Sequence, residues 1–441
     1  MAVSDSVVDI SRFINGRRIG GFQIIVVLLC ALTVFFDGYD TQSVAFVAPS
    51  IAAQWHLSRE ALGPLFVASL FGLLIGSALF GLVADKLGRR NIIMLATLIF
   101  GVCTLGTAQA GGIGELLIFR FLAGLGLGGA MPNAIALTAE YCPERRRATV
   151  VMIMFTGFSI GAAAGGALAA VLIPHFGWRA VWYVGGAVPI LLVPLQWALL
   201  PESLRYLVVS GAARERIEQL VRRIDRGFLV PADARYQSGE ARAEGVPVAH
   251  LFRDGRALGT VLLWIVFFAN LLDIFLLQNW IPVISHSAGL SVQKAVVVGT
   301  LFQVGGVVAA LLIGLVMDRY GSCRTLGLLY GVGCVFAIVL GFAGSSQEAL
   351  MILTFLVGFS VVGGQNAANA LSAIFYPTAM RSTGVGWALG IGRIGAIVGP
   401  LLGAFLLSLH WPDSSLFFVG AVPLFIAMLA VISLGRRYKG I

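Results

Sequence analysis

Charged side chains are scarce in this chain. Asp, Glu, Lys and Arg make up 12% of its 441 residues, whereas hydrophobic residues make up 58%. A soluble domain has about 25% charged residues, and a chain with half that share cannot cover a surface that faces water. The scarcity therefore argues against an ordinary soluble domain and favours lipid as the surrounding solvent.

The sequence also lacks the side-chain patterns of several functional classes. Its five cysteines are scattered without metal-ligand spacing, and a disulfide framework is not expected. They are Cys30, Cys103, Cys142, Cys323 and Cys334. No Gly-x-x-x-x-Gly-Lys-Ser/Thr run occurs, so we expect no step driven by ATP hydrolysis. No nucleophile–base constellation stands out either, and we expect no enzyme activity, no metal and no other cofactor.

Long apolar runs, by contrast, are numerous. A membrane-spanning helix needs about 20 mostly apolar residues, and the sequence holds twelve runs of this kind. They lie near 22–48, 61–83, 91–110, 115–138, 148–173, 178–200, 257–284, 293–316, 325–343, 347–371, 380–407 and 415–434. The runs predict an all-α membrane protein with twelve transmembrane helices.

The net charge of +9 is unevenly distributed along the chain. When the first residues are assigned to the cytoplasm, the segments on that side hold 25 of the 30 Lys and Arg residues. The segments on the other side hold three, which are Arg59, Arg179 and Lys294. This positive-inside bias predicts that both termini are cytoplasmic. The same bias accounts for the basic net charge, so we expect no nucleic-acid partner. Because the first 21 residues are polar, we also expect no cleavable signal peptide.

The second half of the chain repeats the first. Gly81–Gly88 recurs as Gly314–Gly321 at an offset of 233, and Ala136–Pro143 recurs as Ala370–Pro377 at an offset of 234. Such an offset indicates duplication of a six-helix unit, with a substrate site between the halves near the membrane midplane. The expected organisation is a cytoplasmic segment (1–21), an N-terminal six-helix bundle (22–200), a cytoplasmic linker (201–256), a C-terminal six-helix bundle (257–434) and a cytoplasmic tail (435–441).

A short loop after the second apolar run carries the motif Gly81-x-x-x-Asp85-Lys86-x-Gly88-Arg89-Arg90. This run resembles the loop motif of the major facilitator superfamily, and the resemblance implies that family's fold of two pseudo-symmetric six-helix bundles. The glycines suit a tight turn, and the acid can face a helix N-terminus or an arginine across the halves. We predict that the loop and related positions gate the carrier; the residues are Gly81, Asp85, Lys86, Gly88, Arg89, Arg90, Glu140, Arg147, Asp318 and Arg319.

The first apolar run contains Asp37-Gly38-Tyr39-Asp40. Each carboxylate inside an apolar span costs about 2.5–3.5 kcal/mol to insert and is functional by default, and a spacing of three places both on one helix face. The pattern Asp-Gly-x-Asp resembles the aromatic acid/proton symporter family, in which both acids matter for transport. The resemblance implies a bacterial inner-membrane importer of an aromatic carboxylic acid, of the 4-hydroxybenzoate, protocatechuate or benzoate type, coupled to protons.

Two arginines also lie within apolar runs and have no charged counterpart in the repeat. Arg120 corresponds to Thr354, and Arg393 corresponds to Ser159. Because scaffold requirements fall on both halves alike, an unmatched buried charge points to the substrate. The family has intramembrane arginines in these two helices. We assign Arg393 to the substrate carboxylate; Arg120 either binds substrate or forms a structural ion pair with the first helix.

A third buried acid, Asp273, could tune the substrate site, hold a second proton or pair with Arg393. With three acids and two arginines inside the spans, one acid lacks a partner and binds a proton readily, since burial disfavours the charged form. The predicted proton-coupling residues are Asp37, Asp40 and Asp273. The predicted substrate-binding residues are Arg393, Arg120, Tyr39, Gln278, Asn279, Trp280, Gln365, Asn366 and Trp387. The expected partners are a small organic acid, protons and the lipid bilayer, with the protein acting as a monomer.

Three other functions are compatible with parts of the sequence. The Pro201-Glu202-Ser203 motif also occurs in sugar carriers, so a proton-coupled porter for a sugar or a non-aromatic acid stays open. A drug/proton antiporter is a weaker match, because the run Gly157–Gly166 lacks the proline typical of that class. A membrane sensor is the alternative outside transport, although no appended signalling domain is visible.

Overall fold

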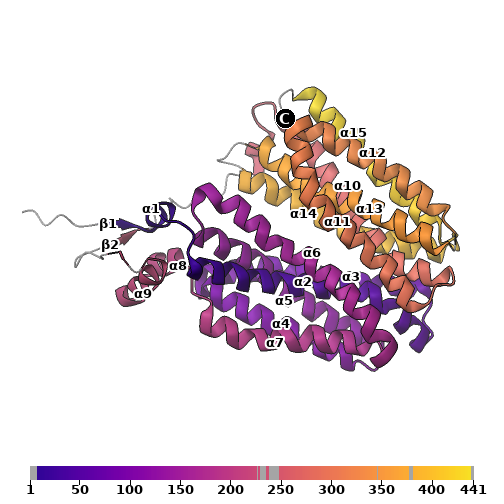
Figure 1. The fold of residues 1–441 in the computed structure, drawn as a ribbon, viewed down its shortest axis with the longest axis horizontal. Helices are drawn as coiled ribbons and strands as arrows, with labels where there is room; N and C mark the ends of the chain where they lie inside the picture. Colours follow the sequence, from indigo (N-terminus) through magenta and orange to yellow (C-terminus); the bar gives the residue numbers. More distant parts are fainter. Residues whose placement is uncertain are drawn as a thin grey trace, which may run out of the picture.

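The computed structural model of this chain is almost entirely helical (Figure 1). It describes residues 7–225, 227–228, 235–237, 248–344, 346–376 and 381–438, except the side chains at positions 7, 82, 85, 148, 152, 235, 318, 381 and 382. Among these residues, twelve helices are long and apolar enough to cross a membrane, which confirms the predicted fold class. The remaining linker positions, the last three residues of the predicted tail, and the side chains of Asp85 and Asp318 lie outside this description.

The twelve long helices form two groups of six that occupy different halves of the molecule (Figure 1). The N-terminal bundle contains α2 (Gly21–Trp55), α3 (Leu62–Leu87), α4 (Arg89–Gln109), α5 (Ile113–Tyr141), α6 (Glu144–Phe176) and α7 (Arg179–Leu199). The C-terminal bundle contains α10 (Ala257–Ser287), α11 (Val292–Tyr320), α12 (Ser322–Gly341), α13 (Gln347–Phe375), α14 (Arg381–Ser408) and α15 (Ser415–Arg437). Short 3-10 helices, η1 (Arg59–Ala61) and η2 (Val248–Phe252), precede α3 and α10.

Several helices extend beyond the predicted apolar runs. The first run was expected to end near residue 48, but α2 continues to Trp55, and α6 begins at Glu144 rather than near 148. Apolarity marks the hydrocarbon layer, whereas backbone hydrogen bonding continues into the polar region beyond it. The length of a helix is therefore greater than the length of its apolar run.

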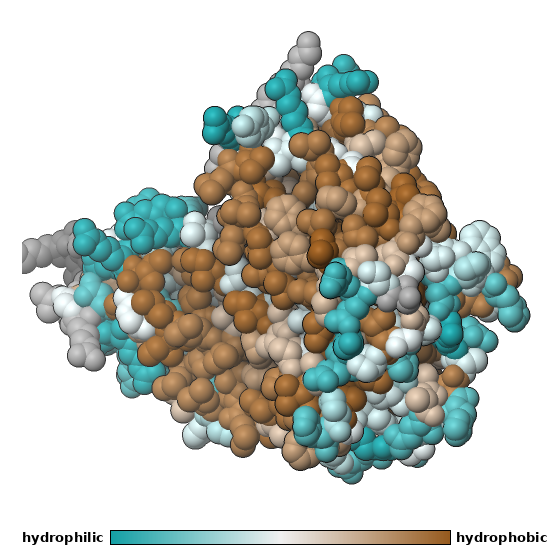
Figure 2. Space-filling view, turned by 45° about the vertical axis from the view of Figure 1, so that its right-hand side comes forward, coloured by the Kyte–Doolittle hydropathy of each residue, from teal (hydrophilic) through white to brown (hydrophobic). Residues whose placement is uncertain are grey.

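The molecular surface has the character expected beside lipid. Hydrophobic residues cover much of the face shown in Figure 2, and hydrophilic residues gather toward the ends of the helices. Large apolar side chains such as Leu28, Ile118, Leu191 and Leu328 are more than half exposed. In water such a surface would aggregate, but acyl chains solvate it, so the sides of both bundles fit a bilayer.

Glycines allow the innermost helices of each bundle to touch through their backbones. A Cβ added to Gly161 of α6 would lie 1.9 Å from the Phe35 carbonyl oxygen of α2. The repeat mate of Gly161 is Gly395 of α14, where a Cβ would lie 2.2 Å from the Phe268 carbonyl oxygen of α10. Only glycine permits such an approach. The duplication read from the sequence is therefore also present in the packing of α6 on α2 and of α14 on α10.

A small structure covers the start of the N-terminal bundle. Strand β1 (Val7–Asp9) pairs in parallel with β2 (Arg235–Gln237) from the linker, and α1 (Ile10–Asn15) follows β1. Helices α8 (Leu204–Val209) and α9 (Arg214–Ile224) lie beside them (Figure 1). The apolar side of α9, which carries the buried Ile217 and Val221, belongs to the same hydrophobic cluster as α1. The amphipathic pattern of α9 thus serves packing within the protein.

We call the end of the molecule at which α2 begins and α15 ends the termini end, and the other end the distal end. The contact surface between the two bundles is called the seam. Across it, α2 packs against α10 and α11, α3 against α14, and α6 against α11. Side-chain contacts across the seam include Ser77–Arg393, Gln42–Gln303, Phe66–Trp280 and Arg59–Asp413. Between described residues, no hydrogen bond or ion pair joins the bundles nearer the termini end than Ser77–Arg393.

Candidate functional site

Asp40 and Arg120 form an ion pair inside the N-terminal bundle. Arg120 Nη1 donates to Asp40 Oδ1 at 2.9 Å, and Nη2 donates to Oδ2 at 2.8 Å. Both side chains are completely buried. This bidentate geometry is the strong form of a charge-assisted hydrogen bond. Of the two roles left open for Arg120, the structural pair with the first helix is the one formed in this state.

The surroundings of this pair also belong to the N-terminal bundle. Thr104 Oγ1 donates to Asp40 Oδ1 at 3.1 Å, and the Trp182 ring lies 5.7 Å from the Arg120 guanidinium carbon. Tyr39, predicted to bind substrate, is buried and donates its hydroxyl to the Val181 carbonyl at 2.8 Å. The group therefore fixes α2 against α4, α5 and α7.

Asp37 lies one helical turn before Asp40 but has a different environment. It is 1% exposed, and Thr41 Oγ1 donates to its Oδ1 at 3.3 Å. Its Oδ2 has no hydrogen-bond partner among the described residues. The intervening Gly38 explains how the helices fit, because a Cβ there would lie 2.0 Å from the Phe158 carbonyl oxygen of α6. The glycine of the motif thus allows α6 to pack directly against the turn that carries both acids.

Arg393 reaches across the seam from α14. Its Nη1 donates to Ser77 Oγ of α3 at 3.0 Å, and the residue is half-buried. Asp37 and Arg393 interact electrostatically but do not form an ion pair in this structure. The side chain that hydrogen-bonds this guanidinium is therefore a neutral hydroxyl. An incoming carboxylate would be a better one.

Asp273 is buried inside the C-terminal bundle without a hydrogen bond. The residue is 0% exposed, and neither carboxylate oxygen has a partner among the described residues. Gly420 of α15 lies so close that a Cβ there would be 2.9 Å from Asp273 Oδ1, and Tyr330 of α12 is within electrostatic range. The side chain thus faces α12 and α15. The pairing of Asp273 with Arg393 that the sequence left open is not formed.

The duplication relates Asp273 to Asp40. An offset of 233 places Asp273 at the repeat position of Asp40, and Thr354 occupies the position of Arg120. Thr354 is fully buried, and its hydroxyl oxygen has no hydrogen-bond partner among the described residues. The C-terminal bundle therefore keeps the buried acid of the repeat but lacks the arginine that neutralises it. An isolated buried carboxyl is stable only when it carries a proton.

Three glutamine side chains join the bundles on the distal side of Asp37. Gln303 Nε2 of α11 donates to Gln42 Oε1 of α2 at 2.8 Å and to Gln278 Oε1 of α10 at 3.1 Å. All three residues are buried. We call this set the amide cluster. Because buried amides must keep their partners, separating α2 from α10 and α11 would require these hydrogen bonds to be replaced.

The remaining predicted substrate residues are dispersed. Trp280 is buried at the seam and donates to the Pro400 carbonyl at 3.1 Å, and Asn279 donates to the Phe275 carbonyl at 2.7 Å. On α13, Gln365 donates to Asn369 at 3.1 Å, and Asn366 is exposed. None of these contacts joins them to Arg393. Their role in substrate binding stays a prediction.

Trp387 lies on a different face of α14 from Arg393. It is 44% exposed and stacks on Trp264 at a centroid distance of 6.0 Å. Its helical position matches that of Ile394 and Phe405, which are also exposed, whereas Arg393 is about 120° away around the helix. The position suits a lipid-facing side chain, and nothing in it brings Trp387 to Arg393.

The predicted gating loop forms a network within the N-terminal bundle. Gly88 has a left-handed φ of 87°, and the next residue, Arg89, forms an ion pair with Glu140 at 2.8 Å. The backbone nitrogen of Arg90 donates to Glu202 Oε1 at 3.1 Å. Tyr206 donates to the Lys86 carbonyl at 2.8 Å. These contacts connect the loop to the end of α5 and to the segment after α7.

Burial raises the pKa of Glu202, while backbone N–H groups of Ser203, Arg90 and Arg89 act in the opposite direction. A Cβ on Gly88 would lie 2.2 Å from a Glu202 carboxylate oxygen, and the positive φ of Gly88 favours glycine at this turn. Arg147 lines a small pocket with Glu140 nearby. Two acids, Glu140 and the partly buried Glu202, thus hold the loop.

The second copy of the loop has the same turn without the same network. Gly321 has a φ of 88°, and the neighbouring Arg319 lies over the Tyr320 ring at 5.5 Å. A Cβ added to Gly321 or to Gly81 would meet nothing within 4 Å. Between described side chains, no hydrogen bond or ion pair connects either loop to the opposite bundle. The gating role stays a prediction, as do the roles of Asp85 and Asp318.

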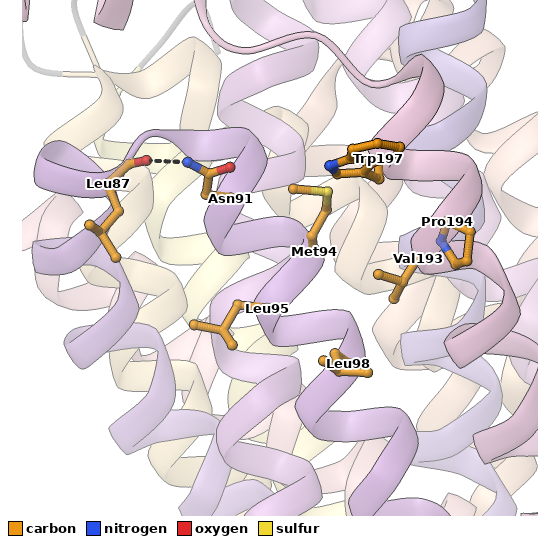
Figure 3. A pocket seen from close by; sticks show the side chains of 8 residues that line it. All are labelled: Leu87, Asn91, Met94, Leu95, Leu98, Val193, Pro194 and Trp197. Atoms are coloured by element: carbon orange, nitrogen blue, oxygen red, sulfur yellow. Dashed lines mark hydrogen bonds between the residues drawn. The ribbon is translucent and has the colours of Figure 1, made fainter.

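A groove of about 580 Å³ lies between α4 and α7 near the termini end (Figure 3). Its lining residues are Leu87, Asn91, Met94, Leu95, Leu98, Val193, Pro194 and Trp197. Asn91 uses its amide to donate to the Leu87 carbonyl at 2.8 Å. The groove carries no charged side chain, and α4 and α7 lie on the side of the bundle away from the seam (Figure 1). It does not suit a carboxylate.

The sequence did not predict the uncharged residues that hydrogen-bond the buried charges, nor the exposed ion pair at the distal end. Ser77, which holds Arg393, and Thr104, which holds Asp40, are single hydroxyl residues in apolar runs and give no distinctive signal. Gln42 lies two residues after Asp40 on α2, so its polarity at that depth was the available indication. The distal ion pair Arg59–Asp413 joins residues 354 positions apart, and no local pattern predicts such a pair.

Comparisons with known proteins agree with this architecture. The sequence profile of the Major Facilitator Superfamily matches residues 30–299 and 263–440. A gallate transporter of Pseudomonas putida is 39% identical over 98% of this chain and 96% of its own length. The 4-hydroxybenzoate transporter PcaK of Pseudomonas aeruginosa is 39% identical over 97% and 96%. The benzoate transport protein of Acinetobacter baylyi is 33% identical over 98% and 93%.

Solved structures with the same fold are more distant in sequence. The xylose transporter XylE from E. coli, in a partially occluded inward open conformation, has a TM-score of 0.72 at 15% identity, covering 96% of this chain and 100% of that chain. Together with the named relatives, the two bundles of spanning helices identify a multi-pass membrane transporter, not an enzyme. The chain belongs to the Major Facilitator Superfamily and, within it, to the aromatic acid transporters.

Proposed function

We propose that this protein imports an aromatic carboxylic acid together with protons by alternating access. The observation that carries the proposal is the electrostatic interaction between Arg393, which reaches across the seam, and the buried Asp37. One is an arginine whose hydrogen bond goes to the hydroxyl of Ser77, and the other is a buried acid with an unpartnered oxygen. The named relatives transport gallate, 4-hydroxybenzoate and benzoate, which all carry a carboxylate on an aromatic ring.

The substrate carboxylate replaces Ser77 as the partner of Arg393. A guanidinium accepts a carboxylate in a bidentate arrangement that a serine hydroxyl cannot match. The bound anion lies near Asp37, and two like charges disfavour each other in a buried site. Substrate binding therefore strengthens proton binding at Asp37, and by reciprocity a proton on Asp37 strengthens substrate binding.

Asp40 and Arg120 keep their ion pair during this step. The pair is completely buried, so a substrate at the seam does not touch it. Its role is to fix the position of α2, which carries Asp37. Asp273 is a second protonated acid, in the C-terminal bundle; its isolation from every described hydrogen-bonding group supports this assignment.

The bundles rock against each other around the charged site. The described contacts extend from Ser77–Arg393 to Arg59–Asp413 at the distal end, which supports a state closed on that side. The excess of Lys and Arg at the termini end supports a cytoplasmic location for that end. The state thus corresponds to a carrier closed toward the outside.

Uptake by purified protein in liposomes with an imposed pH gradient tests this proposal. We expect the wild type to accumulate labelled 4-hydroxybenzoate or gallate above equilibrium. Arg393→Gln should reduce uptake about 100-fold, because a charged partner is lost, and Arg393→Lys about tenfold, because one charge-assisted hydrogen bond is lost.

Arg324→Gln, an exposed arginine in the first turn of α12, is the matched control and should transport normally. Equal uptake by Arg393→Gln and the control would remove Arg393 from the substrate site. Failure of the wild type to accumulate any aromatic acid down a pH gradient would refute the proposed function itself.

A further inference from the structure

Four arginines line one pocket at the termini end of the N-terminal bundle. The pocket has a volume of about 460 Å³ and is formed by Arg17, Arg18, Ile19, Pro143, Arg145 and Arg146. We call it the arginine pocket. It lies where the segment before α2 meets the connection between α5 and α6, and no acidic residue lines it. The transport site at the seam does not use any of these residues.

Contacts on both sides hold the walls of the arginine pocket. The Arg17 guanidinium pairs with Asp225 at 2.8 Å and lies over the rings of Phe13 and Phe228 at 5.2 and 5.6 Å. Arg145 Nη2 donates to the Arg17 carbonyl at 3.3 Å. These contacts link the two segments that form the pocket, so its shape does not depend on the free ends of flexible side chains.

A second link joins the same two segments. The backbone nitrogen of Glu144 donates to Asn15 Oδ1 at 2.8 Å, and Asn15 Nδ2 donates to Glu144 Oε2 at 3.3 Å. The Glu144 carboxylate is thus directed to α1, and Asp225 is directed to Arg17. Arg18 and Arg146 are exposed, and neither neighbouring carboxylate forms an ion pair with them. The pocket keeps an excess of positive charge that an anion can neutralise.

The depth of the pocket indicates which anion. Arg17 and Arg18 immediately precede α2, and Arg145 and Arg146 lie in the first turn of α6. Both helices are membrane spans. Exposed apolar side chains, beginning with Ile24 on α2, follow within about 5 Å along the axis. Lipid phosphates lie at this boundary between polar and apolar surface, and basic pockets between spanning helices bind such headgroups.

We propose that the arginine pocket binds the phosphate of an anionic membrane lipid. Guanidinium groups match the geometry of phosphate oxygens in a bidentate arrangement. The bound lipid bridges the segment before α2 and the start of α6. It thereby stabilises the small structure formed by α1, β1, β2 and α9 against the N-terminal bundle. This site is independent of substrate and of proton coupling.

The test measures lipid retained by the purified protein. Native mass spectrometry would compare phosphatidylglycerol with phosphatidylcholine for the wild type and for Arg145→Gln/Arg146→Gln. Each basic residue near an anionic headgroup contributes about fivefold in affinity, so the double variant should lose phosphatidylglycerol at least about fivefold and keep phosphatidylcholine. The matched control is Arg436→Gln/Arg437→Gln in the last turn of α15, which should change by less than about twofold.

Three results would overturn the proposal. The first is an equal loss of phosphatidylglycerol in the α15 control, which would mean diffuse attraction to the basic end of the molecule. The second is unchanged phosphatidylglycerol retention in the pocket variant. The third is displacement of the lipid by excess inorganic phosphate, which would indicate that the pocket binds a soluble anion. Thermal unfolding in phosphatidylcholine checks that the variants are folded. If the double variant is unstable there, Arg18→Gln is used instead, because Arg18 is exposed, and it should still lower phosphatidylglycerol retention several-fold.

Discussion

Asp37 and Asp40 lie one turn apart on α2, yet their surroundings give them different roles. Asp40 accepts both guanidinium hydrogen bonds of a completely buried Arg120, so both of its carboxylate oxygens are already engaged. Asp37 has a weak contact with Thr41 and an unpartnered oxygen beside the seam. We therefore propose Asp37 as the acid that exchanges protons, and we assign Asp40 to supporting the helix that carries it.

Asp40→Asn should destabilise the protein more than it affects the chemistry of transport. The substitution leaves Arg120 charged and buried without a partner, which costs about 3–5 kcal/mol. We expect a large fall in melting temperature for the purified variant in detergent. The double variant Asp40→Asn/Arg120→Gln should recover part of this loss, because the orphaned charge is removed as well.

The control for this cycle is Asp254→Asn, which removes an exposed acid outside the spans and should unfold like the wild type. A single Asp40→Asn variant with wild-type stability would show that the pair is not structural. In that case Asp40, like Asp37, would be a candidate for the acid that exchanges protons.

At the scale of helices, the close approach of α6 to α2 sets the position of Asp37. Gly161 and Gly38 face the partner backbone so closely that a Cβ on either would lie at about 2 Å from a carbonyl oxygen. Helix α14 repeats this arrangement against α10 through Gly395 and Gly399, where a Cβ would lie 2.2 and 2.3 Å from carbonyl oxygens. The two innermost helices of each bundle therefore act as one rigid element.

Gly161→Ala should separate α6 from α2 and destabilise the N-terminal bundle. Overpacking of this kind costs about 1–3 kcal/mol, and both the melting temperature and uptake should fall. Gly390→Ala on α14 is the matched control, because a Cβ there meets nothing within 4 Å. If Gly161→Ala and Gly390→Ala have equal stability, the backbone contact does not hold the helices together.

Much of the helical architecture could be predicted from the sequence. Twelve apolar runs and the repeated motifs predicted the number of spans and the duplication, because both follow from strong, local signals. The ends of α2 and α6 could not be predicted from apolarity, since helical hydrogen bonding continues past the hydrocarbon. The pairing of β1 with β2 joins residues 7–9 to residues 235–237, and two strands of three residues carry too little pattern to be recognised.

The candidate site could be predicted in part. Charges inside apolar runs identified Asp37, Asp40, Asp273, Arg120 and Arg393 because a buried charge is costly and therefore conspicuous. Their partners depended on tertiary structure. Three acids and two arginines suggested one unpartnered acid, whereas the structure pairs Asp40 with Arg120 and leaves both Asp37 and Asp273 without an ion pair.

For the whole molecule, the contacts across the seam extend to the distal end, where they hold the two bundles together. Arg59 and Asp413 close the distal end at 2.5 Å, and the amide cluster lies below them. Both charged side chains are partly exposed, so the pair contributes at most about 1 kcal/mol. Such a contact can bias the two states of a carrier without locking it.

Arg59→Glu should shift the carrier toward a state open at the distal end, since it places a like charge beside Asp413. Pulsed electron-spin measurements between labels on the two distal loops would record the distances. We expect a longer-distance population in Arg59→Glu and a return to the wild-type distribution in Arg59→Glu/Asp413→Arg. The same distribution in all three proteins would mean that this pair has no part in closing the distal end.

The most direct test of proton coupling at Asp37 follows protons and substrate in the same liposomes. A pH-sensitive dye enclosed with the purified protein would report the lumen as labelled aromatic acid enters without an imposed gradient, with protein-free liposomes correcting for passive leakage. The account predicts that entry through the wild type acidifies the lumen in proportion to substrate, and that Asp37→Asn loses this acidification. Substrate entry through the wild type with no acidification beyond the leakage control, or unchanged acidification in Asp37→Asn, would contradict it.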